Sequence, residues 1–197
     1  MRFCKKISLF FALMLACVCV FAAPNGIVIK TAELVSSEEN YKLGADIEVS
    51  FDESIEEAVN KGVPLNFLLE FQVVKPRSYW FDKEIVTTTT NFTLSYHALS
   101  RQYLVSHNGR QTSYETLSEA KLELEQIDDW KVLEKAQLEK GATYKAVLLV
   151  RLDQSKLPKA LQVDAIGSES WDLKSQKFEW DLKEPKESKP KEPSRSP

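Results

Sequence analysis

Apolar and polar residues alternate along much of the chain, and a period of two residues is typical of a β-strand with one buried face. The clearest example spans residues 43–51, whose apolar row consists of Leu43, Ala45, Ile47, Val49 and Phe51. A strand with one apolar and one polar face favours an antiparallel sheet. Its predicted partner is the segment 27–35, which is joined to it by the polar turn 36–40.

The middle of the chain contains several further predicted strands. Residues 65–74 are almost continuously apolar, and residues 86–96 place apolar or β-branched side chains on one face. Residues 103–107 and 110–112 flank Asn108-Gly109, a dipeptide that strongly favours a two-residue hairpin turn. The pattern therefore predicts consecutive antiparallel strands.

Four more strands are predicted in the C-terminal half, at residues 130–138, 143–153, 161–166 and 171–182. Apolar residues on both faces of 143–153 indicate a central strand that is covered on both sides. Within 171–182 the apolar phase changes between Trp171-Leu173 and Phe178-Trp180-Leu182. We therefore expect a bulge or turn near Ser175-Gln176.

Two short helices are predicted between the strands. Residues 52–61 place Ile55, Ala58 and Val59 on one face, and Gly62 and Pro64 end this helix. Thr112 and Glu115 match a capping box for a second helix over residues 115–127, whose apolar stripe is Leu117, Ala120, Leu124 and Ile127. Together the patterns predict one mostly-β domain over residues 24–182, an antiparallel sandwich that is immunoglobulin-like in general architecture.

The two ends of the chain differ in composition from this body. Residues 1–22 have the basic start and the apolar centre of a secretory signal peptide, with cleavage predicted after Ala22. An uncleaved membrane anchor and a lipid anchor at Cys17 are the alternatives. Residues 183–197 contain no apolar residue and four of the eight prolines, which predicts a disordered tail rich in Pro, Lys and Glu. We expect a periplasmic protein that contacts the membrane only through an uncleaved or lipidated leader.

Cysteine usage and charge exclude several functions. All three cysteines lie in the leader, so the mature chain has no thiol for nucleophilic, metal or redox chemistry and no disulfide. Of the 26 basic and 29 acidic residues, the leader holds three basic ones and the tail holds five basic and three acidic ones. The body therefore has 18 basic and 26 acidic residues, a net charge of about −8, which disfavours nucleic acid as a partner.

The sequence indicates no cofactor, no metal site and no catalytic residue. The two histidines, His97 and His107, lack the spacing of a metal-binding motif, and no glycine-rich phosphate loop is present. No Gly-x-Ser-x-Gly motif supports a nucleophilic serine beside His97.

The most unusual chemistry lies between residues 75 and 105. Nine aromatic and polar residues form the predicted recognition or structural cluster: Arg77, Tyr79, Trp80, Phe81, Asp82, Tyr96, His97, Arg101 and Tyr103. With Arg77, Asp82 and Arg101 one strand pair apart, we expect either an ion-paired structural cluster or the lining of a binding groove. A groove of this kind suits an extended peptide, a glycan or a carboxylate.

Four motifs give the chain a family resemblance. They are GVPLNF at 62–67, KPR at 75–77 with YWFD at 79–82, LSYHALSRQY at 94–103, and LD at 152–153 followed by LP at 157–158. With these motifs the chain resembles a family of exported proteobacterial proteins that is catalogued as domain of unknown function 4390, whose members are often named proline-rich signal peptide protein. The resemblance implies no catalytic or ligand-binding residue. It implies a gene beside a membrane sensor kinase, whose extracytoplasmic domain is therefore an expected partner.

These observations favour a non-catalytic interaction or accessory module of the bacterial envelope. Two alternatives stay open. The first is a periplasmic carrier that holds a small ligand against Tyr79, Trp80 and Arg77. The second is a hydrolase that uses His97 with a nearby serine.

Overall fold

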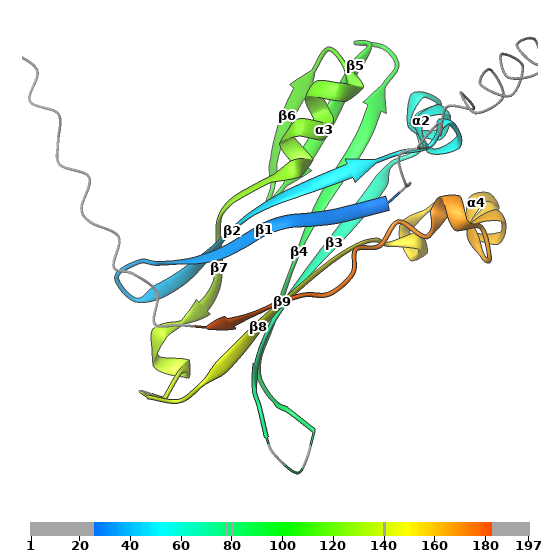
Figure 1. Cartoon of the computed structure of the whole chain (residues 1–197). Coiled ribbons are helices and arrows are strands. Elements are labelled where there is room, and N and C mark those ends of the chain that lie inside the picture. Colours follow the sequence, from blue (N-terminus) through cyan, green and yellow to red (C-terminus); the bar gives the residue numbers. More distant parts are fainter. Residues whose placement is uncertain (1–25, 78, 80, 140, 183–197) are drawn as a thin grey trace, which may run out of the picture.

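The computed structural model describes residues 26–77, 79, 81–139 and 141–182, and it consists mainly of two antiparallel sheets that face each other (Figure 1). The prediction of a mostly-β antiparallel fold is confirmed. The immunoglobulin-like arrangement stays a prediction. The predicted signal peptide at 1–22 and the predicted tail at 183–197 lie outside the described residues.

The smaller sheet has three strands in the order β1-β2-β7. Its strands are β1 (Gly26–Ser36), β2 (Asn40–Ser50) and β7 (Gln126–Glu134). As predicted, β1 and β2 pair as an antiparallel hairpin, with Ile27 opposite Val49 and Ser36 opposite Tyr41. The alternation of β2 buries Leu43, Ala45, Ile47 and Val49 against the larger sheet.

The larger sheet has six strands in the order β6-β5-β4-β3-β8-β9. They are β3 (Leu65–Lys75), β4 (Lys83–His97), β5 (Gln102–His107), β6 (Arg110–Tyr114), β8 (Tyr144–Leu152) and β9 (Phe178–Leu182). Asn108 and Gly109 join β5 to β6 with φ of 49° and 76°, the two positive values that a type I′ turn requires. The strand β8 lies between β3 and β9, which confirms the predicted central strand.

The core lies between the two sheets. Phe71 of β3 is fully buried, and its ring centroid lies 6.4 Å from that of Trp130 on β7 in an edge-on arrangement. Burial of large aromatic side chains of this kind dominates the stability of a domain without disulfides. A cavity of only about 10 Å³ remains between the sheets, lined by residues such as Phe67, Phe92 and Leu124. This cavity is too small to hold a ligand.

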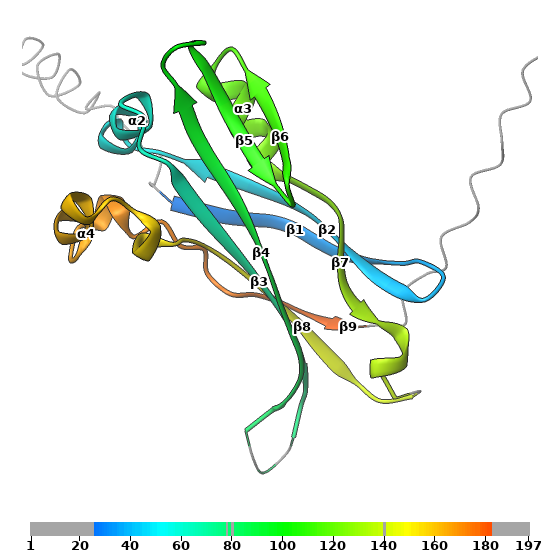
Figure 2. The same ribbon diagram turned by 180° about the vertical axis from the view of Figure 1, so that it is seen from behind.

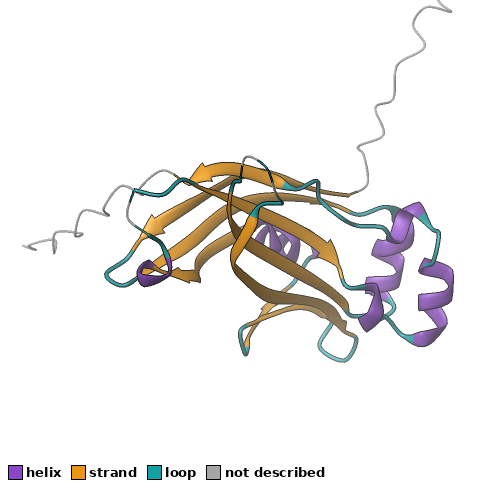
Figure 3. Ribbon diagram, turned by 90° about the horizontal axis from the view of Figure 1, so that it is seen from below, coloured by secondary structure: helices purple, strands orange, loops and turns teal. Residues whose placement is uncertain are grey.

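Two of the three α-helices in the described residues connect strands of the two sheets. The helix α2 (Glu53–Asn60) follows the N-cap Asp52, which accepts a 2.9 Å hydrogen bond from the Ile55 N–H, and it buries the predicted residues Ile55, Ala58 and Val59. The helix α3 (Leu117–Glu125) lies between the layers and contacts β2 and β5 (Figure 3).

The predicted limits of this second helix are wrong. Its capping box consists of Thr116 and Glu119, whereas Thr112 pairs with Val105 in the β5–β6 ladder and is therefore unable to cap a helix. Ile127, which was expected on the helix, is a buried residue of β7. The helix is shorter because it begins only after its N-cap Thr116 and because β7 takes Gln126 and Ile127 from its predicted C-terminal end.

The predicted strand at 161–166 is also wrong, because these residues belong to the helix α4 (Lys159–Ala165) and its C-cap. The Gln162 carboxamide donates hydrogen bonds to the carbonyl oxygens of Ser155 and Leu157, which fixes the first turn of α4. Short 3₁₀ helices complete the connections: η1 (Lys135–Gln137), η2 (Gln154–Lys156) and η3 (Glu169–Trp171).

The predicted irregularity near Ser175-Gln176 is confirmed. Arg151 of β8 bridges to Lys174, whereas Leu148 pairs with Phe178, so the segment before β9 has one more residue than β8 opposite it. The extra residue reverses the phase of the apolar side chains. Regular pairing of this last strand begins only at Phe178.

Candidate functional site

The loop between β3 and β4, called here the aromatic loop, comprises residues 76–82. β3 and β4 pair from Leu65 opposite Leu94 to Lys75 opposite Lys83, with one register shift between Val73 and Val74, so the loop lies at the far tip of a long hairpin. This hairpin extends past the neighbouring elements in opposite views (Figures 1 and 2). The fold therefore presents the aromatic loop at a distance from the core.

Two aromatic side chains of the aromatic loop are almost completely exposed. Tyr79 is 94% and Phe81 is 96% exposed. Large aromatic residues are usually at least half buried, because removal of their apolar surface from water stabilises the folded chain. Two such residues at one tip are typical of a surface that is covered when a partner binds.

Polar contacts hold the base of the aromatic loop. The Arg77 N–H donates a 3.2 Å hydrogen bond to Asp82 Oδ1, which joins the two ends of the loop. The Lys75 ammonium lies 2.7 Å from Glu139 Oε2, and this hydrogen bond raises the pKa of Lys75 and lowers the pKa of Glu139. Asp82 therefore has a structural contact, and the loop is anchored next to the segment that precedes β8.

The second half of the predicted cluster lies around the β4–β5 turn. The rings of Tyr96 and Tyr103 form a cross-strand pair with their centroids 4.9 Å apart. The Tyr103 hydroxyl donates a hydrogen bond to Asn60 Oδ1 at the end of α2, and burial raises the pKa of Tyr103. These tyrosines connect the hairpin to α2. Arg101 is exposed in the turn itself, with a φ of 55°.

The prediction that Arg77, Asp82 and Arg101 lie one strand pair apart is wrong. Arg77 and Asp82 belong to the aromatic loop, whereas Arg101 follows the opposite end of β4. Fifteen residues of extended strand separate the two ends by about 50 Å. The single ion-paired cluster or groove is therefore not formed by the described residues. Trp80, which was also predicted to belong to it, lies outside the described residues.

His97 has a local contact within the β4–β5 turn. Its Nδ1 atom lies 2.9 Å from Ser100 Oγ, and the Ser100 N–H donates to the same nitrogen at 3.3 Å. The serine is thus close to the histidine, as the hydrolase alternative requires. Both residues are exposed, and within the described part of the chain no carboxylate bonds to the second ring nitrogen of His97. The contact closes the turn.

His107, to which no sequence motif assigned a role, is more closely packed than His97. Its ring stacks on Phe92 with 3.8 Å between centroids, and its Nε2 atom lies 3.0 Å from the buried Thr90 Oγ1. Burial lowers the pKa of His107. The β4–β5 ladder, which continues to His97 opposite Gln102 at the turn, places His107 opposite Phe92.

The described residues limit the chemistry further. They contain no group of three or more His, Cys, Asp or Glu side chains placed to hold a metal ion. None of the helices in the described ranges has the length and apolar composition needed to cross a membrane.

The fold and these surfaces define a two-sheet β domain with a protruding aromatic hairpin tip. The chain belongs to the family described as domain of unknown function (DUF4390), whose model matches residues 24–181. The family resemblance of the four sequence motifs is thereby confirmed. No curated protein and no solved structure matches the chain.

Proposed function

We propose that this protein is a non-catalytic interaction module of the bacterial envelope and that the aromatic loop is its contact surface. The observation that supports the proposal is the near-complete exposure of Tyr79 and Phe81 at the tip of the β3–β4 hairpin. Exposed aromatic side chains become buried anchors in protein interfaces, since they supply a large apolar area with few rotatable bonds.

The compartment is part of the same proposal. The leader-like composition of residues 1–22 supports export to the periplasm with cleavage after Ala22. The family's association with membrane sensor kinases makes the extracytoplasmic domain of such a kinase the proposed partner. Mass spectrometry of the purified envelope protein tests the location: an N-terminus that retains Met1, or a lipid on Cys17, contradicts it.

The carrier alternative has less support. It requires a ligand to be held by Arg77, Tyr79 and Trp80, but Arg77 and Tyr79 are exposed on the aromatic loop, and the cavity between the sheets is only about 10 Å³. A ligand at the loop would remain mostly in water. Such a site is unlike the concave pockets that bury most of a small ligand.

Site-specific photocrosslinking in living cells tests the interaction surface. A photoreactive phenylalanine analogue is placed at Tyr79 or at Phe81, and in a control protein at Leu99. Leu99 is 93% exposed but lies in the β4–β5 turn, at the other end of the same strand. We expect a protein adduct of one defined mass from Tyr79 and Phe81 and none from Leu99.

The double substitution Tyr79→Ser with Phe81→Ser separates binding from folding. Because both side chains are exposed, their loss changes the free energy of unfolding by less than about 0.5 kcal/mol. Capture of the partner should nevertheless disappear. Adducts with lipid or small molecules only, equal crosslinking from Leu99, or unchanged capture by the double variant would each contradict the proposal.

A further inference from the structure

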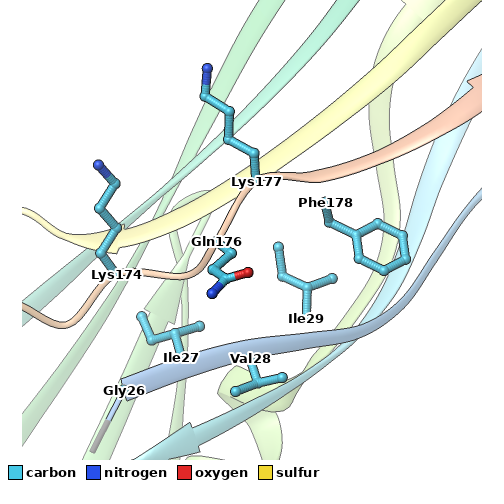
Figure 4. A pocket seen from close by; sticks show the side chains of 8 residues that line it. All are labelled: Gly26, Ile27, Val28, Ile29, Lys174, Gln176, Lys177 and Phe178. Carbon is cyan, nitrogen blue, oxygen red and sulfur yellow. The ribbon is translucent and has the colours of Figure 1, made fainter.

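One side of the molecule is bounded by two strand edges that no other strand of the described residues covers. β1 is the outer strand of the smaller sheet, and β9 with the preceding residues 174–177 is the outer strand of the larger one. A groove of about 460 Å³ separates them, and Figure 4 shows residues 174–178 running beside β1. This groove, called here the edge groove, is separate from the aromatic loop.

The outer edge of β1 carries backbone groups that face the groove. The Val49 N–H donates to Glu125 Oε1, at the side of β2 where β7 begins, and so points away from β1. Ile27 lies opposite Val49, and Ile29 lies opposite Ile47 in the same register. In an antiparallel pair, opposite residues alternate between pairs that hydrogen-bond to each other and pairs whose N–H and C=O groups point away from the partner strand. Ile27 and Ile29 belong to pairs of the second kind, so their N–H and C=O groups face the open edge of β1.

The opposite wall of the edge groove is equally open. The Leu152 N–H donates to the Leu173 carbonyl, and the Ser175 N–H donates to the Val150 carbonyl. These two bonds flank Lys174, whose own peptide groups therefore point away from β8 and toward the groove. Figure 4 shows the Gln176 carboxamide directed from this wall toward β1.

The side chains of the edge groove combine an apolar floor with a basic rim. Ile27, Ile29 and Phe178 line the groove, and Lys174 and Lys177 project from the 174–178 wall (Figure 4). Both lysines are exposed, and neither has an ion-pair partner within the described part of the chain. The body as a whole is acidic, but these two lysines make the edge groove locally positive. The positive charge favours binding of an acidic segment.

We propose that the edge groove binds an extended acidic segment of a partner protein, which adds a strand to β1. The N–H and C=O groups of Ile27 and Ile29 would pair with its backbone, its apolar side chains would cover Phe178, and its carboxylates would meet Lys174 and Lys177. The chain's own residues 183–197 do not suit this role. They are net basic, and their four prolines remove N–H groups that a strand needs.

Binding of a defined peptide tests the proposal. The probe is an end-blocked, fluorescent peptide of alternating valine and glutamate, eight residues long, and binding to the purified protein is measured by anisotropy at low salt. We expect the double variant Lys174→Glu with Lys177→Glu to weaken binding at least tenfold. The control variant, Lys156→Glu with Lys159→Glu, has the same change in net charge at two exposed lysines elsewhere and should bind within twofold of the wild type.

Amide hydrogen exchange locates the bound peptide. We expect the exchange of the Ile27 and Ile29 amides to slow at least tenfold, whereas the Val28 amide, which faces β2, is already protected. Equal binding of a valine–lysine peptide, unchanged binding by the Lys174/Lys177 variant, or protection at another edge such as β6 would overturn the proposal. So would concentration-dependent protection of Ile27 without peptide, because the occupant would then be a second copy of this chain.

Discussion

The hydroxyl of Ser175 is predicted to hold the bulge that precedes β9. Ser175 is 4% exposed, and its Oγ atom accepts a 3.0 Å hydrogen bond from the Val150 N–H, while its own N–H donates to the Val150 carbonyl at 2.8 Å. The side chain thus replaces the backbone carbonyl that a regular strand would have offered to β8. Ser175→Ala removes this acceptor and leaves a buried N–H without a partner among the described residues.

The cost of this substitution follows from the desolvation of the amide. A buried donor without a partner costs about 1–3 kcal/mol, and the site of the lost hydroxyl is buried, since Ser175 is 4% exposed. We expect the free energy of unfolding to fall by about 2 kcal/mol, which lowers Tm by about 4–8 °C in a domain of this size. Urea unfolding followed by tryptophan fluorescence measures it, because Trp171 and Trp180 lie on either side of the bulge.

Ser155→Ala is the matched control for Ser175→Ala. The Ser155 hydroxyl also makes a side-chain hydrogen bond, to Asp153 Oδ1 at 2.6 Å, but it is exposed. Water therefore replaces the lost partner, and the change should stay within about 0.5 kcal/mol. If Ser175→Ala also changes the free energy of unfolding by less than about 0.5 kcal/mol with an unchanged m-value, the argument from the buried amide is refuted.

Two further substitutions test the β5–β6 hairpin and its packing. Gly109→Ala should reduce the free energy of unfolding by about 1 kcal/mol, because φ at this turn residue is 76° and alanine disfavours a positive φ. Asn108→Gly should not reduce it, because glycine accepts the positive φ of 49° at that position. Equal effects of the two substitutions in urea unfolding would contradict this prediction. His107 should make stability depend on pH, because burial lowers its pKa in the folded state. The unfolded chain then binds the proton more tightly, so stability is retained above about pH 6.5 and falls as the pH decreases from there through the lowered pKa. His107→Gln should remove this part of the pH dependence, measured by urea unfolding between pH 5 and 8, whereas His97→Gln should not.

Local patterns in the sequence were sufficient to predict much of the fold. Alternation predicted which face of β2 is buried, and the short polar turn 36–40 predicted β1 as its partner, because a short turn places consecutive strands side by side. Asn108-Gly109 predicted the β5–β6 hairpin, because few other dipeptides tolerate two positive φ values. The bulge at Ser175 was visible as a change of apolar phase between Leu173 and Phe178. Each of these signals depends on a few neighbouring residues.

The wrong predictions concern segments whose local sequence is compatible with more than one secondary structure. Two consecutive signals, Thr112 with Glu115 and Thr116 with Glu119, both match a helix start, and pairing of Thr112 with Val105 selected the second. Residues 161–166 form a run too short to distinguish strand from helix by period. The helix α4 was selected by contacts of Gln162 with the preceding carbonyl groups.

The proposed binding surfaces were predictable from the sequence only in part, and the rest required the tertiary structure. Composition alone identified residues 75–105 as unusual, because aromatic and charged side chains are concentrated there. Only the tertiary structure decided that Tyr79 and Phe81 lie at one end of β4 and that Tyr96 and Arg101 lie at the other, since proximity in sequence becomes separation along an extended strand. The edge groove had no sequence signal, because it combines residues 26–29 with residues 174–178, which are brought together by the packing of two sheets.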